Sequence, residues 1–171
     1  LQVYILKSMT VQVLYKNKVK SSNSGVIALF AEDKFQFKNT GNFLSKKEAS
    51  YVEKILKNKK NIKEEIISLN MNEKTTLIFI SLKKDLKGFD VENLGANFYS
   101  FIKKNSIKNV SIISESLKIK PGKDFIGRFM HGLKLKSYEF NIYKSKKIKT
   151  VFTVNVVGKQ SFLSLKNKLK F

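Results

Sequence analysis

The 171-residue sequence contains no cysteine and a single histidine, His131. Without thiolates, disulfide scaffolds and cysteine zinc sites are excluded, and most other zinc sites need several histidines. One proline and eight glycines exclude a collagen-like or low-complexity chain. No apolar run approaches the roughly 20 residues that cross a bilayer, and residues 1–8 lack the apolar stretch of a secretory signal. These absences predict a soluble, cytoplasmic domain.

Positive charge dominates the composition, with 34 basic against 13 acidic residues and a net charge of +21. Arg128 is the only arginine, so nearly all of this charge comes from lysine. Arginine's planar fork suits the reading of base edges, whereas lysine acts as a solvated point charge. Lysine, asparagine, isoleucine and phenylalanine also share A/T-rich codons, which alone would raise the lysine count. A compositionally biased surface and a nucleic-acid-binding surface therefore both remain open.

Apolar patterns divide the chain into strands and helices. Residues 10–16 alternate apolar and polar side chains, as a half-buried strand does. The continuous apolar run VIALFA at 26–31 is typical of a strand buried on both faces. Further strands are predicted at 62–69, 75–82, 109–114 and 148–157, and a turn at Pro121-Gly122.

Three helices are predicted among these strands. Ser45 and Glu48 have the spacing of a capping box, which starts the first helix. Asp90 is predicted to cap the second helix, in which Phe98 and Ile102 share the stripe that faces the sheet. A third helix follows residue 124, with apolar residues four apart. The sequence thus predicts a three-layer α/β/α domain, with a mainly parallel, mixed sheet and helices on both faces.

Enzymatic motifs are absent from the sequence. It contains no G-x-S-x-G elbow, no G-x-x-x-x-G-K-[ST] loop and no G-x-G-x-x-G after the first strand. Glu32-Asp33 and Glu64-Glu65 are sequence neighbours, whose side chains point apart, so neither pair forms an acid/base dyad. A lone histidine indicates a structural or surface role for His131. We therefore predict no catalytic and no metal-binding residue in this chain.

The C-terminal third has the highest density of charge, because residues 116–171 carry 14 basic and 2 acidic side chains. Tyr138, Phe140 and Tyr143 precede a lysine run, and interleaved aromatics and lysines can stack bases and hold phosphates. The alternation of Tyr138, Phe140 and Ile142 equally fits one buried strand face with lysines outside. The candidate contacts for an anion or nucleic acid are Lys144, Lys146, Lys147 and Lys149.

The same region resembles the closing segment of the N-terminal domain of leucyl (cytosol) aminopeptidases. In that family a helix leads into a G-x-x-L-x-S-Y-x-F-x-x-Y-K-x-K type of sequence. The upstream order of strands and helices is also similar, and the resemblance covers roughly residues 9–158. The residues that fit the segment are Gly132, Leu135, Ser137, Tyr138, Phe140, Tyr143, Lys144 and Lys146.

The resemblance implies a macro-domain-like fold and a non-catalytic role. In the family, two divalent metals (zinc or manganese) and a catalytic lysine and arginine lie in a separate C-terminal domain, whose N-T-D-A-E-G-R type of signature is absent here. The whole enzyme removes N-terminal residues from peptides as a hexamer. This domain would support assembly and shape access to the active sites. Some bacterial members also bind DNA, so weak, non-specific DNA binding is compatible with the resemblance.

The sequence departs from the family pattern in its loops. Glycines often follow the strand that matches 75–82, whereas this chain reads Ser81-Leu82-Lys83-Lys84. Macro-domains that bind ADP-ribose use glycine-rich phosphate loops, which this sequence lacks. We expect an extension at 1–8 before Met9, the domain at 9–158, and the start of a linker helix toward a catalytic domain at 159–171. The resemblance thus implies a fragment of a longer protein or a truncated reading frame.

Overall fold

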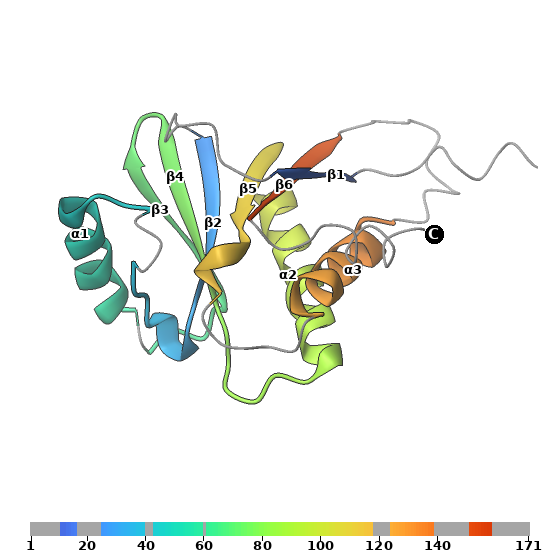
Figure 1. Cartoon of the computed structure of the whole chain (residues 1–171), viewed down its shortest axis with the longest axis horizontal. Coiled ribbons are helices and arrows are strands. Elements are labelled where there is room, and N and C mark those ends of the chain that lie inside the picture. The colour runs from blue at the N-terminus through green and yellow to red at the C-terminus, as the bar shows by residue number, and fades with distance from the viewer. Residues whose placement is uncertain are drawn as a thin grey trace, which may run out of the picture.

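A computed structural model describes residues 11–16, 25–39, 43–59, 61–117, 124–138 and 151–158. In these ranges one six-stranded sheet lies between helix α1 (Lys46–Lys57) on one face and helices α2 (Gly88–Lys104) and α3 (Phe125–Ser137) on the other (Figure 1). The predicted three-layer α/β/α class is therefore confirmed. None of the described helices is long and apolar enough to cross a membrane.

The strands follow the order β1-β6-β5-β2-β4-β3 across the sheet. Among the described strands only β3 runs antiparallel to its neighbour, at the edge beside β4. The sheet is thus mixed and mainly parallel, as the sequence predicts. The strands are β1 (Val11–Lys16), β2 (Gly25–Ala31), β3 (Ile66–Asn72), β4 (Thr75–Ser81), β5 (Asn109–Ile113) and β6 (Phe152–Val157).

The central strand β2 divides its side chains between two apolar cores. Ala28 and Phe30 pack with α2 and α3 on one face, whereas Leu29 and Ala31 pack with α1 on the other. All four residues are buried. Because a central parallel strand has no solvated face, its sequence is apolar throughout rather than alternating.

The predicted capping box starts α1. The Ser45 hydroxyl accepts a hydrogen bond from the Glu48 N–H at 3.3 Å, and the Glu48 carboxylate accepts one from the Ser45 N–H at 2.8 Å. Two backbone donors that the helix itself leaves unpaired are thereby satisfied. These hydrogen bonds hold the pKa of the Glu48 carboxyl below its usual range. Beyond the cap, Val52 and Leu56 turn toward the sheet and are buried.

The prediction that Asp90 is the N-cap of α2 is wrong. The helix begins at Gly88 after the capping position Lys87, so Asp90 lies within the first turn. Its carboxylate reaches back and accepts a hydrogen bond from the Lys87 N–H at 2.9 Å. An acidic side chain is favourable at either position, since both lie near the positive end of the helix dipole. The sequence therefore marks the start of the helix but not which residue caps it.

Helices α2 and α3 cross at close range through two glycines. A Cβ at Gly95 would overlap the Phe129 carbonyl oxygen, and one at Gly132 would overlap the carbonyl oxygen of Glu92. Only glycine permits this approach of the two backbones. The crossing brings the rings of Phe98 and Phe129 to 5.6 Å between centroids, where both side chains are fully buried.

Several predicted boundaries differ from the structure. The strand predicted at 62–69 begins only at Ile66, because the preceding Lys63 and Glu64 are exposed. The strand predicted at 109–114 ends at Ile113, where a 3-10 turn begins. Of the strand predicted at 148–157, Val151 is described but precedes the strand, which runs from Phe152 to Val157. Residues 148–150, the turn at 121–122, the extension at 1–8 and the linker helix at 159–171 lie outside the described ranges.

Phe98 and Ile102 face the sheet as predicted, and both are 0% exposed. The substitution Phe98→Ala should lower the free energy of unfolding by about 3–5 kcal/mol, because truncating a buried phenylalanine leaves a cavity. Phe89, on the same helix, is 61% exposed and provides the control. Phe89→Ala should change stability by less than about 0.5 kcal/mol. Urea titrations measure both variants, and equal losses would contradict this packing.

Candidate functional site

The four lysines nominated from the sequence, Lys144, Lys146, Lys147 and Lys149, lie outside the described residues. Their role as anion or nucleic-acid contacts stays a prediction. Tyr138, at the start of the same segment, is described: it follows the end of α3 and is 46% exposed. Phe140 and Ile142, which the alternative of a buried strand face also needs, lie outside the described residues, so that alternative stays open.

A crevice opens at the carboxyl end of β2. In open parallel sheets, ligands bind where the chain connections leave neighbouring strands in opposite directions. The chain runs from β2 through α1 toward β3 and β4, whereas β5 lies on the other side of β2 and leads through α3 to β6. The boundary between β2 and β5 is thus the switch point of this sheet. The crevice is lined by Phe30, Ala31, Glu32, Gln36, Lys38, Leu82 and Ser116.

A serine hydroxyl separates β2 from β5 at this point. The two strands pair only over Ile27–Leu29 and Ser111–Ile113, after which β5 continues into a 3-10 turn, Ser114–Ser116. The next N–H of β2, that of Phe30, donates instead to the Ser116 hydroxyl at 2.9 Å, and this hydroxyl donates to the Ile113 carbonyl at 2.6 Å. These side-chain hydrogen bonds thus replace the backbone hydrogen bonds between β2 and β5, and the ends of the two strands separate.

A second serine fixes the turn that follows β2. Lys34 and Phe35 both have a φ of 56°, in the left-handed region that costs non-glycine residues energy. The Phe35 N–H donates to the Ser81 hydroxyl at 3.3 Å, and that hydroxyl donates to the Glu32 carbonyl at 3.4 Å. Glu32 and Gln36 also exchange backbone hydrogen bonds of 2.8 and 3.2 Å. Together these bonds hold a strained turn at the rim of the crevice.

The crevice is too small and too poor in free donors for a pyrophosphate. Its cavity volume is about 10 Å³, room for about one water molecule. A phosphate cradle needs several backbone N–H groups aimed at the anion. Here the N–H groups of Phe30 and Phe35 are already bonded to serine hydroxyls. Glu32 and Lys38 place one charge of each sign at the lining, so the crevice has no strong preference for anions.

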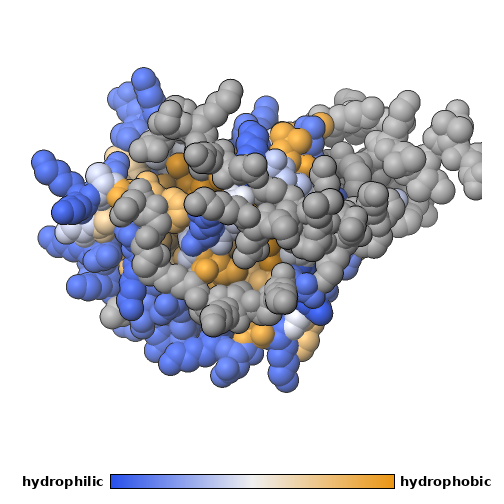
Figure 2. Space-filling view, in the orientation of Figure 1, coloured by the Kyte–Doolittle hydropathy of each residue, from blue (hydrophilic) through white to orange (hydrophobic). Residues whose placement is uncertain are grey.

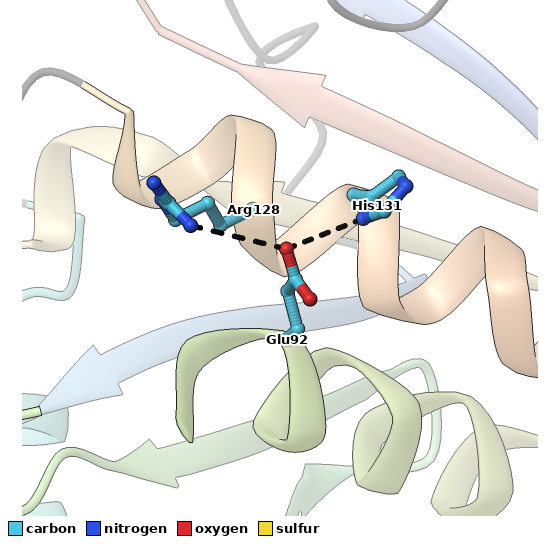
Figure 3. A network of polar contacts seen from close by, with 3 residues as sticks. All are labelled: Glu92, Arg128 and His131. Carbon is cyan, nitrogen blue, oxygen red and sulfur yellow. Dashed lines mark hydrogen bonds and ion pairs between the residues drawn. The ribbon is translucent and has the colours of Figure 1, made fainter. Parts of the chain in front are cut away.

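The single histidine and the single arginine meet one carboxylate between α2 and α3 (Figure 3). The Nδ1 atom of His131 lies 3.3 Å from Oε1 of Glu92, and an Arg128 guanidinium nitrogen lies 4.0 Å from the same oxygen. All three side chains are about one-third to one-half exposed. An exposed pair of this kind contributes at most about 1 kcal/mol. The cluster ties the two helices together where the glycines bring them close.

Sequence reasoning missed the exposed face of α1. Tyr51 is 52% exposed there, with Lys47 one turn before it and Lys54 one turn after it. The spacing of these three residues, four and three apart, is the sequence signal that could have indicated a shared helix face. Separately, no group of three or more histidine, aspartate and glutamate side chains suited to a metal occurs in the described ranges.

Comparison with solved structures shows similarity of fold at low sequence identity. A leucine aminopeptidase variant from tomato matches with a TM-score of 0.68 at 12% identity, over 96% of this chain. This chain spans about a third (35%) of that aminopeptidase. A macrodomain from Oceanobacillus iheyensis with MES bound matches at 0.64 and 12% identity, over 95% of this chain and 92% of its own. The DarG macrodomain of Thermus aquaticus matches at 0.55 and 7%, over 87% and 99%.

The sequence itself gives no such match. No protein-family model matches it, and no curated protein sequence does. At 7–13% identity, the structural likeness shows a macrodomain-like α/β fold, shared by the aminopeptidase region and by independent macrodomains. Because one fold serves several functions, function has to be argued from particular surfaces.

Replacing Ser116 by alanine should destabilise the domain by about 1–3 kcal/mol, because the buried Phe30 N–H would lose its acceptor. Ser50→Ala on the exposed side of α1 is the matched control, with an expected change below about 0.5 kcal/mol. Urea titration gives both values. Hydrogen exchange at the Phe30 amide should also quicken in Ser116→Ala alone. Unchanged exchange there would show that the hydroxyl does not hold this strand end.

Proposed function

We propose that this chain is the non-catalytic N-terminal domain of a leucyl aminopeptidase-like metallopeptidase. The observation that carries the proposal is the likeness of 96% of this chain to about a third of a leucine aminopeptidase. The end of α3 supports it independently, since Gly132, Leu135, Ser137 and Tyr138 fit the family segment. Gly132 also has a structural reason to be glycine, because it lets α3 approach α2.

Within the proposal, the work of the parent enzyme is divided between domains. The catalytic domain would hold two divalent metals, zinc or manganese, and remove N-terminal residues from peptides. The present domain would support a hexameric assembly and shape access to the active sites. Residues 9–158 would form it, with an extension at 1–8 and the start of a linker helix at 159–171. No metal ligand is assigned to this chain.

Reading the gene beyond the codon for Phe171 tests this parentage directly. The proposal expects an in-frame continuation that encodes a metal-binding domain rich in aspartate, glutamate and lysine ligands. A stop codon directly after Phe171 in several related genomes would argue instead for a free-standing domain.

Nucleic-acid binding is a second candidate function. The observation that favours it is a net charge of +21, which comes almost entirely from lysine. Dense positive charge displaces counterions from phosphates and so attracts any nucleic acid. The lack of arginines means that this attraction would carry little sequence information. The two candidate functions are compatible, because one concerns assembly and the other a surface.

The purified chain should not release leucine from a leucyl amide substrate, even with zinc or manganese added. Peptide hydrolysis of this class needs several ligands around two metals, and none is assigned to this chain. Continuous assay of amide hydrolysis, with and without a chelator, makes the measurement. Activity that the chelator abolishes would place a catalytic centre in this chain. It would contradict the proposal that catalysis belongs to a separate domain.

DNA binding by the chain should be weak, insensitive to sequence and sensitive to salt. If about six phosphates are engaged, affinity should fall roughly 10³-fold or more between about 50 and 200 mM salt. Fluorescence anisotropy with several unrelated duplexes measures both properties. Sequence-selective binding that persists at about 150 mM salt and depends on Lys144, Lys146, Lys147 and Lys149 would contradict it.

A further inference from the structure

The outer face of α1 carries an exposed aromatic ring between lysines. Tyr51 is 52% exposed although it is one of the largest side chains on the helix. Lys47 precedes it by four residues and Lys54 follows it by three, so the three side chains form one stripe. At 1.5 Å per residue, the two lysines start about 10 Å apart along the helix axis. A stacked strand carries about three phosphates over that length.

The stripe keeps a net positive charge despite the acidic residues of α1, because two lysines flank Tyr51 and one carboxylate is near it. Glu48 lies three residues before Tyr51 and remains charged, but its hydrogen bonds with Ser45 hold it in the capping box at the start of the helix. Glu53 lies two residues after Tyr51, which places it on nearly the opposite side of the helix. Among the described residues, no ion pair involves Lys47 or Lys54. Both ammonium groups are therefore available to a ligand.

The helix presents the stripe from a rigid position. Val52 and Leu56 anchor α1 in the apolar core between this helix and the sheet, and the capping box fixes the start of the helix. The helix lies at the β3 side of the sheet, away from α2 and α3 (Figure 1). Figure 2 shows hydrophilic side chains projecting from that side of the molecule. A partner can thus approach the stripe without displacing the described helices.

We propose that this face of α1 binds single-stranded nucleic acid, with a base stacked on Tyr51 and phosphates held by Lys47 and Lys54. Sequence-tolerant binding of single strands combines a basic track with exposed aromatic rings. A duplex would use the lysines only, because its bases are already stacked. An anionic membrane is a poorer fit, because the apolar residues Val52 and Leu56 are buried and cannot insert. The inference rests on the nucleic-acid candidate function and is independent of the aminopeptidase proposal.

The contribution of the ring is tested with the full chain and a labelled oligouridine of about 12 nucleotides, within the usual site sizes of such surfaces. Tyr51→Ala should weaken binding about 5- to 150-fold, the change expected when one stacked base is lost. Tyr51→Phe should bind like the parent chain, since it keeps the ring. An abasic oligomer of the same length should bind Tyr51→Ala and the parent equally. Fluorescence anisotropy at about 50 mM salt measures the affinity of each protein for each oligomer.

The lysines are tested by a charge-matched pair of double variants. Lys47→Ala with Lys54→Ala should lower affinity and make the slope of log K against log salt shallower by about 1.4, since each single-strand phosphate contact contributes about 0.7. Lys104→Ala with Lys108→Ala removes the same charge from exposed positions at the end of α2 and just after it. This control should retain affinity within about twofold and keep the slope. Circular dichroism confirms that each variant is folded.

The outcomes distinguish whether the chain binds nucleic acid at all from whether α1 is the binding surface. If the parent chain binds no oligomer at about 50 mM salt, the nucleic-acid function and this inference both fail. If it binds but the α1 variants behave like the Lys104 and Lys108 control, the function stands and the assignment to α1 is overturned. Loss of binding to anionic phospholipid vesicles in the α1 variants, with oligomer binding unchanged, would also overturn it in favour of a membrane surface.

Discussion

Parallel pairing of β2 with both neighbours is the constraint on which the rest of the domain depends. A hairpin cannot join parallel strands, so the chain must cross a face of the sheet to reach each one. The route from β2 toward β4 carries α1 on one face, and the route from β4 to β5 carries α2 on the other. The two cores follow from these routes. So does the crevice, because β2 and β5 part where the chain leaves them in opposite directions.

The sequence predicts those elements whose signals are local. The apolar run of β2 and the capping box of α1 each lie within seven residues, and both are found where expected. Asp90 is misplaced because an acidic side chain suits the cap and the first turn alike. The crevice could not be predicted, since Ser116 reaches Phe30 across 86 residues and Ser81 reaches Phe35 across 46. Only the folded sheet brings those hydroxyls to their partners.

The shared fold restricts the possible functions of this chain less than its loops do. An aminopeptidase region and independent macrodomains have the same strand-and-helix framework, so the framework is compatible with more than one role. The described part of the crevice is more informative, because serine hydroxyls already accept hydrogen bonds from the N–H groups of Phe30 and Phe35. The strained turn at Lys34 and Phe35 is held in place by the Ser81 hydroxyl. These two N–H groups are therefore not available to hold a phosphate.

The lysine excess illustrates why arrangement matters more than total charge. A genome-wide bias spreads lysines over all exposed positions and gives each the same weak attraction for phosphates. A bias toward A/T-rich codons raises the tyrosine count as well as the lysine count, so the position of Tyr51 between two lysines is not by itself a sign of selection. The exposed ring adds nothing to the core, since Val52 and Leu56 already anchor α1. A selected surface differs from a compositional one only if Tyr51 and its flanking lysines contribute more to binding than lysines elsewhere on the surface do.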